Sequence, residues 1–391
     1  MSKNTLIFIA ACAGMFLFGI TLITLGSVAT DLKEKYQLTA VESGILFSIL
    51  PLGILSGSLI FGPVCDRYGY KLLLILACVG VFAGFEGIAY SHSFLLLEIS
   101  IFVFGVGGGV INGATNAVVS DISETHKGAN LSLLGVAYGL GALGMPMVLG
   151  WLHHISPFRI VAAVGWITLA VAFFYLFLNF PAAKQLKNKG NANYKSLFKL
   201  LLLLIAFFLF FQSSFEAIIN NWTTTYLTTK GVMTESGALY ALSFHIGGMV
   251  AMRFVSGSFL RKVSEIKVLW ICLMMLFAGI VLMQVGTTPF VITAGLVLSG
   301  AGLAEGFPLM LGITGKHFAR LSGTAFSFVF TVALLGNMLV NYLMGFITEH
   351  FGVRHLTTVA YVEIICMVLI FFYIVQLLKS DKNDVSETMA Q

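Results

Sequence analysis

The chain has 391 residues, of which 58% are hydrophobic and 10% are charged. Soluble domains carry about 25% charged residues, so this composition, with a mean hydropathy of +0.95, excludes a soluble protein and indicates a polytopic membrane protein. The formal net charge of +5 bears on membrane orientation and is not a signal for nucleic-acid binding.

Twelve apolar segments are long enough to cross a bilayer core of about 30 Å. They lie near residues 5–30, 43–62, 72–90, 94–119, 131–153, 158–180, 197–222, 238–260, 266–286, 290–315, 322–348 and 355–378. With the N-terminus in the cytoplasm, sixteen Lys and Arg residues fall in cytoplasmic connections and five on the opposite side. Because cytoplasmic loops are enriched in these residues, both termini are predicted to be cytoplasmic. The membrane is expected to be a bacterial-type inner membrane.

The polar stretch 181–196 divides the chain almost in half. It separates a predicted bundle of six helices at 1–180 from a second at 197–378, and a polar tail at 379–391 is expected to be disordered. A shift of 195 residues superposes seven glycines on seven others, which indicates an internal repeat. The pairs are Gly53–Gly248, Gly62–Gly257, Gly105–Gly300, Gly107–Gly302, Gly128–Gly323, Gly141–Gly336 and Gly150–Gly345.

The connection between the second and third segments reads G-P-V-C-D-R-Y-G-Y-K from Gly62 to Lys71. Gly62 and Gly69 allow close backbone approach, and Arg67 and Lys71 suit a cytoplasmic surface. Asp66 is a carboxylate at a helix boundary, where a cation or a helix N-terminus would stabilise it.

This connection resembles the loop between helices 2 and 3 of the major facilitator superfamily, although Tyr70 stands where that family usually has arginine. The resemblance implies an all-α polytopic fold with 12 transmembrane helices in two pseudo-symmetric six-helix bundles that transports by alternating access. It also implies a gating role for Asp66, Arg67 and Lys71. Asp66 would contact the N-terminus of the eleventh segment near Ser322 and close the cytoplasmic side. The alternative is a pair between Asp66 and Arg67 or another arginine nearby.

Polar side chains within the seventh segment form the first candidate binding site. Gln212, Glu216 and Asn220 share a helix face at i, i+4 spacing, and Asn221 and Trp222 follow. Amides and carboxylates bond hydroxyl groups, and a flat indole ring stacks on the apolar face of a sugar. The stripe therefore predicts a site for a polyhydroxylated ligand, with a hydrogen-bond network between helices as the alternative.

Other polar groups within the spans are functional candidates because burying them in a bilayer is costly. Glu305 lies among glycines and Pro308 in the tenth segment, which predicts an irregular, cavity-lining helix with a site role for Glu305 or a structural pair with Arg253 or His245. His245 can titrate near neutral pH or serve as a packing residue. Two pairs at i, i+4 spacing could line a cavity or bond helices together: Asn112 with Asn116, and Asn337 with Asn341.

Two longer stretches resemble the fucose–galactose–glucose/proton symporters. They are E-A-I-I-N-N-W-T-T-T-Y-L in the seventh segment and G-V-G-G-G-V-I-N-G-A-T-N in the fourth. Where that family has a carboxylate in its fourth helix this chain has Asn112, and near its acid in the first helix stand Gly26 or other uncharged residues. A proton carrier would therefore have moved, and Glu216 and Glu305 are its candidates.

The resulting prediction is a monomeric secondary transporter that takes up a neutral sugar or a similar small polar solute with a proton. The alternatives are a proton-driven exporter of drugs or metabolites and a non-transporting sensor on the same fold. No cofactor, metal or nucleic-acid partner is expected. An enzyme is not expected either, because the sequence has no nucleotide loop, metal cluster or nucleophile constellation.

Overall fold

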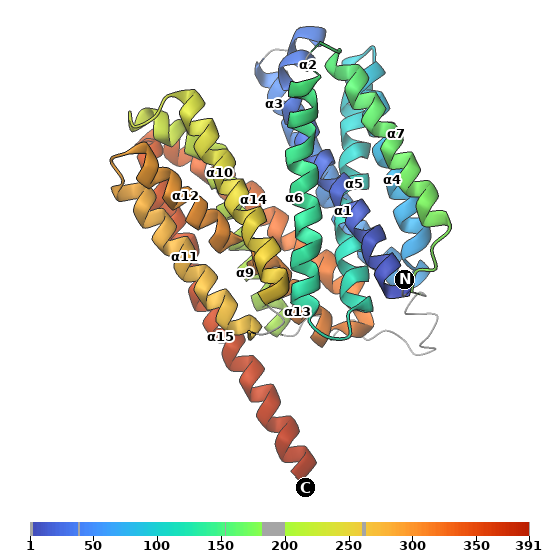
Figure 1. Ribbon diagram of the computed structural model, residues 1–391, viewed down its shortest axis with the longest axis vertical. Coiled ribbons are helices and arrows are strands. Elements are labelled where there is room, and N and C mark those ends of the chain that lie inside the picture. Colours follow the sequence, from blue (N-terminus) through green and yellow to red (C-terminus); the bar gives the residue numbers. More distant parts are fainter. Residues whose placement is uncertain (1–2, 38–39, 153, 182–199, 260–262, 391) are drawn as a thin grey trace. The chain divides into compact units, whose positions relative to one another are not determined.

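The computed structural model describes residues 3–37, 40–152, 154–181, 200–259 and 263–390 (Figure 1). These residues form helices joined by short turns, and the described ranges contain no strand. The first half holds α1 (Lys3–Ser27), α2 (Ala29–Tyr36), α3 (Ala40–Tyr68), α4 (Tyr70–Tyr90), α5 (Phe94–Ile122), α6 (Lys127–Trp151) and α7 (Pro157–Leu176). The second half holds α9 (Leu200–Thr229), α10 (Glu235–Phe259), α11 (Glu265–Val285), α12 (Pro289–Leu303), α13 (Gly306–His317), η2 (Ala319–Leu321), α14 (Ser322–Phe351), η3 (Val353–His355) and α15 (Leu356–Ala390).

Each of the twelve predicted segments carries a helix. Eleven helical stretches within the described residues are long and apolar enough to cross a membrane, and α10 occupies the remaining predicted segment, the eighth, with 25 residues. In a bilayer every backbone polar group must be satisfied within the segment, which is why long apolar runs become helices. Capping side chains start several of them: Ser93, Ser264 and Thr288 accept hydrogen bonds from backbone N–H groups three residues later.

The chain divides into two compact units. The first comprises Met1–Ala192 with Gly315–Thr331, and the second comprises Asn193–Thr314 with Val332–Gln391. In the first unit α3 and α4 pack on α5, and α1 packs on α6; in the second, α10 and α11 pack on α12, and α9 packs on α15. Helix α14 begins in the first unit and continues in the second. Residues 182–196 of the predicted linker lie outside the described residues.

The predicted glycine repeat appears in the helix packing of both units. A Cβ at Gly107 of α5 would lie 2.7 Å from the carbonyl oxygen of Ala77, and one at Gly302 of α12 would lie 2.6 Å from that of Cys272. Gly302 stands 195 residues after Gly107, and Cys272 stands 195 residues after Ala77, so the two contacts are equivalent in the repeat. The same relation links Gly53–Phe102 with Gly248–Val297, and Gly105–Leu50 with Gly300–His245. The two units therefore use the same close helix contacts, which only glycine permits.

Lysine side chains complete the ends of two helices. The Lys71 Nζ donates to the carbonyl oxygen of Leu176, the last residue of α7, at 2.6 Å. At the end of α11 the Lys230 Nζ lies 3.2, 2.7 and 3.0 Å from the carbonyl oxygens of Met283, Gln284 and Gly286. Partial burial there lowers the pKa of the Lys230 ammonium below its usual range. Both lysines satisfy carbonyl groups that the helix itself leaves without donors.

The predicted disorder of the tail at 379–391 is wrong: α15 continues as a helix to Ala390 (Figure 1). Residues 380–390 contain neither glycine nor proline, and they extend a helix that already exists, so the unfavourable nucleation step is absent. A short helix, α2, was also not predicted. It contacts the end of α4, where the Lys35 Nζ donates to the Ala89 carbonyl and the Tyr36 hydroxyl to the Ser91 carbonyl.

Candidate functional site

Asp66 holds the first turn of α14. Its carboxylate is 1% exposed and accepts hydrogen bonds from the backbone N–H of Gly323 at 3.3 Å, the N–H of Thr324 at 2.8 Å and the Thr324 hydroxyl at 2.7 Å. The first N–H groups of a helix have no partners within that helix and carry a partial positive charge. Asp66, on α3, therefore caps the N-terminus of α14, although Asp66 and Thr324 are 258 positions apart in the sequence.

A second carboxylate holds the same helix start. Asp121, near the end of α5, accepts from the Ser322 hydroxyl at 2.9 Å and from the Tyr70 hydroxyl at 2.5 Å. Tyr70 is the position at which the motif differs from the family, which usually has arginine there. In this chain the uncharged Tyr70 hydroxyl donates its hydrogen bond to the Asp121 carboxylate. Asp121 and Ser322 were not predicted as site residues; the sequence feature that pointed to Asp121 is an acid two residues after the end of the fourth predicted segment.

A glycine lets α3 approach α14 closely. Gly62 lies inside α3 and not in the turn, and a Cβ there would stand 2.5 Å from the Ser327 Cβ and 2.6 Å from the Gly323 carbonyl oxygen. The turn itself consists of Gly69, which has a φ of +86°. Of the other two predicted gating residues, the exposed Arg67 lies over the Tyr68 ring, and Lys71 caps α7 as described above.

The tenth predicted segment is broken between α12 and α13, and side chains from two other helices complete the break. Pro308 lacks an N–H for the Ala304 carbonyl four residues earlier, and the Arg253 Nε donates to that oxygen at 3.2 Å. The Gln212 Nε2 donates to the neighbouring Leu303 carbonyl at 3.0 Å. Gln212 is 2% exposed, so it bonds helices together at the break.

Two glutamates lie beside this break. Glu305 is fully buried between α12 and α13, and its carboxylate accepts a hydrogen bond from the Ser256 hydroxyl of α10. Glu216 is half-buried on α9, within electrostatic range of the Arg253 guanidinium. The structure thus brings both predicted glutamates to one region of the second unit. Arg253 connects them, because it donates to the Ala304 carbonyl at the break and interacts electrostatically with Glu216.

Further along α9, polar side chains connect to α14. The Trp222 Nε1 donates to the Asn341 Oδ1 at 2.9 Å, and the Asn337 Nδ2 donates to the Ser213 carbonyl at 3.3 Å. The Asn220 Oδ1 is buried and has no hydrogen-bond partner within the described residues, while Asn221 is exposed. The Asn220 side chain thus carries a hydrogen-bond acceptor that no described residue satisfies.

The remaining predicted residues bond within or between helices. The His245 Nδ1 lies 3.0 Å from both the Leu296 carbonyl oxygen and the Ser299 hydroxyl, in a fully packed position. In α5 the Asn116 Nδ2 donates to the Asn112 carbonyl at 2.8 Å and to the Asn112 Oδ1 at 3.1 Å.

One buried acid was missed altogether. Glu363 of α15 is 2% exposed, and its Oε1 lies 2.5 Å from the Ser214 Oγ of α9. The sequence feature that could have identified Glu363 is a single carboxylate within the twelfth apolar segment. The same feature identified Glu216 and Glu305 as candidates.

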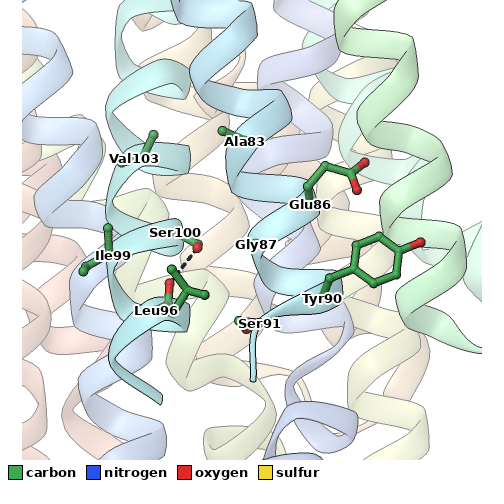
Figure 2. A pocket seen from close by; sticks show the side chains of 9 residues that line it. All are labelled: Ala83, Glu86, Gly87, Tyr90, Ser91, Leu96, Ile99, Ser100 and Val103. Atoms are coloured by element: carbon green, nitrogen blue, oxygen red, sulfur yellow. Dashed lines mark hydrogen bonds between the residues drawn. The ribbon is translucent and has the colours of Figure 1, made fainter. Parts of the chain in front are cut away.

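A cavity of about 370 Å³ lies in the first unit between α4 and α5 (Figure 2). Its lining is Ala83, Glu86, Gly87, Tyr90, Ser91, Leu96, Ile99, Ser100 and Val103. The Ser100 hydroxyl donates to the Leu96 carbonyl at 2.6 Å, and Figure 2 shows the carboxyl group of Glu86 pointing away from Ser100 and Val103. The cavity is mainly apolar and lacks the converging polar groups of a solute site.

Comparison with protein families matches residues 7–318 to the Major Facilitator Superfamily. Among curated proteins, the inner membrane transport protein YdiN of Escherichia coli K12 is 21% identical, with 95% of this chain and 90% of YdiN covered. The sodium-dependent glucose transporter 1A of Mus musculus is 24% identical, with 85% and 87% covered.

Among solved structures, the E. coli fucose:proton symporter FucP has a similar fold. Its outward conformation superposes with a TM-score of 0.80 at 18% identity, covering 95% of this chain and 99% of FucP. At this identity the likeness establishes the arrangement of helices and leaves the solute to be argued from side chains.

Proposed function

Because this chain belongs to the major facilitator superfamily, we propose that it moves a neutral sugar or a similar small polar solute across the membrane together with a proton. The resemblance inferred from the Gly62–Lys71 motif is confirmed by the family match and by the fold. The protein is a multi-pass membrane transporter of this superfamily. Solute, coupling ion and direction are the parts that we propose.

One observation supports a polyhydroxylated solute above others: the polar stripe on α9 next to α14. Glu216 is half-buried, and the buried Asn220 Oδ1 has no partner within the described residues. The half-buried Trp222 is fixed by Asn341, which orients its ring. A carboxylate, a vacant amide oxygen and an immobilised indole on neighbouring turns can bond hydroxyl groups and stack on an apolar sugar face. The names of two relatives, a glucose transporter and a fucose symporter, agree with this solute class.

Glu216 and Arg253 provide a means of coupling. Protonation of Glu216 would remove the negative charge near Arg253, whose Nε is bound to the Ala304 carbonyl at the break between α12 and α13. Loss of that charge changes the electrostatic environment of the break, so proton binding and helix geometry are linked. Glu305, bonded to Ser256, is the second carboxylate in the same region.

Gating is proposed to rest on the contact between Asp66 and the first turn of α14. Formation of the three hydrogen bonds would hold the cytoplasmic side closed, and their loss would allow it to open. Cytoplasmic termini are part of this proposal and rest on the distribution of Lys and Arg along the sequence, and the proposed working unit is a monomer.

The test is uptake into proteoliposomes of labelled glucose, galactose, fucose and N-acetylglucosamine, with and without an inward proton gradient. Accumulation of one sugar only with the gradient is the expected result. Glu216→Gln should abolish that accumulation and spare solute exchange, and Glu305→Gln should act in the same direction.

A matched control is Glu98→Gln, a half-buried acid on α5 that should leave accumulation unchanged. Equilibration of a sugar without accumulation would overturn proton coupling, and no uptake of any sugar would overturn the solute class. Unchanged accumulation in both glutamate variants would overturn their coupling role.

A further inference from the structure

The carboxyl group of Glu363 is buried in the second unit between α15 and α9. It is 2% exposed, its Oε1 lies 2.5 Å from the Ser214 Oγ, and its Oε2 has no hydrogen-bond partner within the described residues. A buried carboxylate anion requires donors or a cation at both oxygens, because leaving it unpaired in an apolar interior is very costly. An ionised Glu363 therefore fits this position poorly.

Counting hydrogen atoms leads to the same conclusion. The Ser214 hydroxyl lies 3.0 Å from the Phe211 carbonyl oxygen on its own helix, as well as close to Glu363. A serine hydroxyl has one hydrogen, and a carbonyl oxygen can only accept. If the serine hydrogen goes to Phe211, the hydrogen between the Ser214 Oγ and the Glu363 Oε1 must come from the carboxyl group. A protonated Glu363 satisfies both contacts at once, and an ionised one satisfies only one of them.

Within the described residues the Ser214 hydroxyl is the hydrogen-bond partner of the Glu363 carboxyl group, and no cation is bonded to either of its oxygens. The elements packed on α15 are α9, α11 and η3. Their titratable groups are Glu216 and Tyr226 on α9, Glu265, Lys267 and Cys272 on α11, and Arg354 and His355 on η3. On α15 itself, Cys366 lies one turn further on and interacts electrostatically with Glu363, and the Tyr361 hydroxyl donates to Gln284. Lys230 directly follows α9, and its Nζ is bound to three backbone carbonyls at the end of α11.

We infer that Glu363 is a proton-binding site that is protonated in this structure and that exchanges its proton during the transport cycle. The part about transport rests on the proposed function; the protonated state rests on the contacts alone. Glu363 stands seven residues after the start of α15, about 10 Å along the helix. The start of α15 is therefore the nearer end for the proposed exchange, in which a proton from water forms an O–H bond with the carboxylate and returns to water when that bond breaks.

The experiment is infrared difference spectroscopy of the purified full chain in lipid nanodiscs, which needs no solute. We expect a carbonyl stretching band of a protonated carboxyl group in the wild type, and its loss in Glu363→Gln. Ser214→Ala should keep the band and change its frequency, because the hydrogen bond to Oε1 is gone. Glu349→Gln, an exposed acid on α14, is the matched control and should keep the band unchanged.

Titration to about pH 10 and transfer into heavy water then test exchange. We expect the band to decrease reversibly at high pH and to shift in heavy water. A carbonyl stretching band that is as intense in Glu363→Gln as in the wild type would overturn the protonated state of Glu363. A wild-type band that neither titrates nor shifts would overturn exchange, because the proton would then be a permanent part of the packing.

Transport assays address the coupling part separately. In proteoliposomes Glu363→Gln should lose gradient-driven accumulation of the solute and keep solute exchange. Accumulation equal to the wild type would overturn the role in transport. If the wild type transports no sugar, the proposed function fails, while the infrared result still decides whether Glu363 binds an exchangeable proton.

Discussion

Replacement of Asp66 by asparagine should release the first turn of α14 from α3. The carboxylate accepts from two N–H groups and one hydroxyl of that turn. In Asp66→Asn the single carbonyl oxygen can keep the two bonds from Thr324, but the amide NH₂ then faces the N–H of Gly323. The variant loses one hydrogen bond to a charged acceptor, about 1.5–3 kcal/mol, and the charge–dipole attraction, about 0.3–1 kcal/mol.

The expected sum of about 2–4 kcal/mol corresponds to a change of about 30-fold to several hundred-fold in the opening equilibrium of this turn. Hydrogen exchange with mass spectrometry measures it directly, because the protected groups are the backbone N–H groups of Gly323 and Thr324. Peptides that cover residues 319–327 should exchange faster by that factor in Asp66→Asn. Thr324→Ala removes only the hydroxyl bond and should speed exchange about tenfold, for a loss of about 1.5 kcal/mol.

Glu34→Gln is the control, since Glu34 is an exposed acid on α2. It should leave exchange at α14 unchanged. Equal protection of the 319–327 peptides in the wild type and in Asp66→Asn would refute the reasoning, because the carboxylate would then contribute nothing to holding the helix start.

Three further substitutions test other contacts. Gly62→Ala places a methyl group 2.6 Å from a backbone oxygen of α14 and should cost about 1–3 kcal/mol of stability, seen as a lower melting temperature in detergent. Gly80→Ala is its control and should be neutral, because the added methyl group would make ordinary contacts at 3.8 Å. Equal melting temperatures of the two variants would contradict the packing argument. Gln212→Met leaves the Leu303 carbonyl without its donor and should cost about 1–3 kcal/mol, with faster exchange at the start of α13; unchanged exchange there would refute the bridge. Lys230→Met removes the donor to three carbonyls at the end of α11 and should cost about 1 kcal/mol; an unaltered exchange rate in the last turn of α11 would count against it.

The membrane spans follow from the sequence because a bilayer leaves the backbone few choices. A long apolar run must satisfy its own hydrogen bonds, so each of the twelve predicted segments became a helix. An irregular helix in the tenth segment was predicted from the glycines and Pro308 around Glu305, since proline lacks the N–H that a regular helix uses, and the structure divides this segment into α12 and α13. The glycine repeat was likewise visible, because close helix contacts need glycine at matching places in both units. The tail at 379–391 was misread because polarity alone was taken as disorder.

The partners of the polar side chains were decided by the tertiary structure. The Gln212 side chain bonds a carbonyl 91 residues away, and the Glu363 side chain reaches a serine 149 residues away. Spacing along α9 showed that Gln212, Glu216 and Asn220 share a face, but it did not show that this face meets the break between α12 and α13 at Gln212. Periodicity reports which side chains lie together on one helix, whereas the choice between a structural bond and a vacant acceptor depends on the helix packed opposite. The sequence by itself determined the membrane class, the spans and the repeat, and only the packed structure decided which buried polar groups have partners, because those partners come from distant parts of the chain.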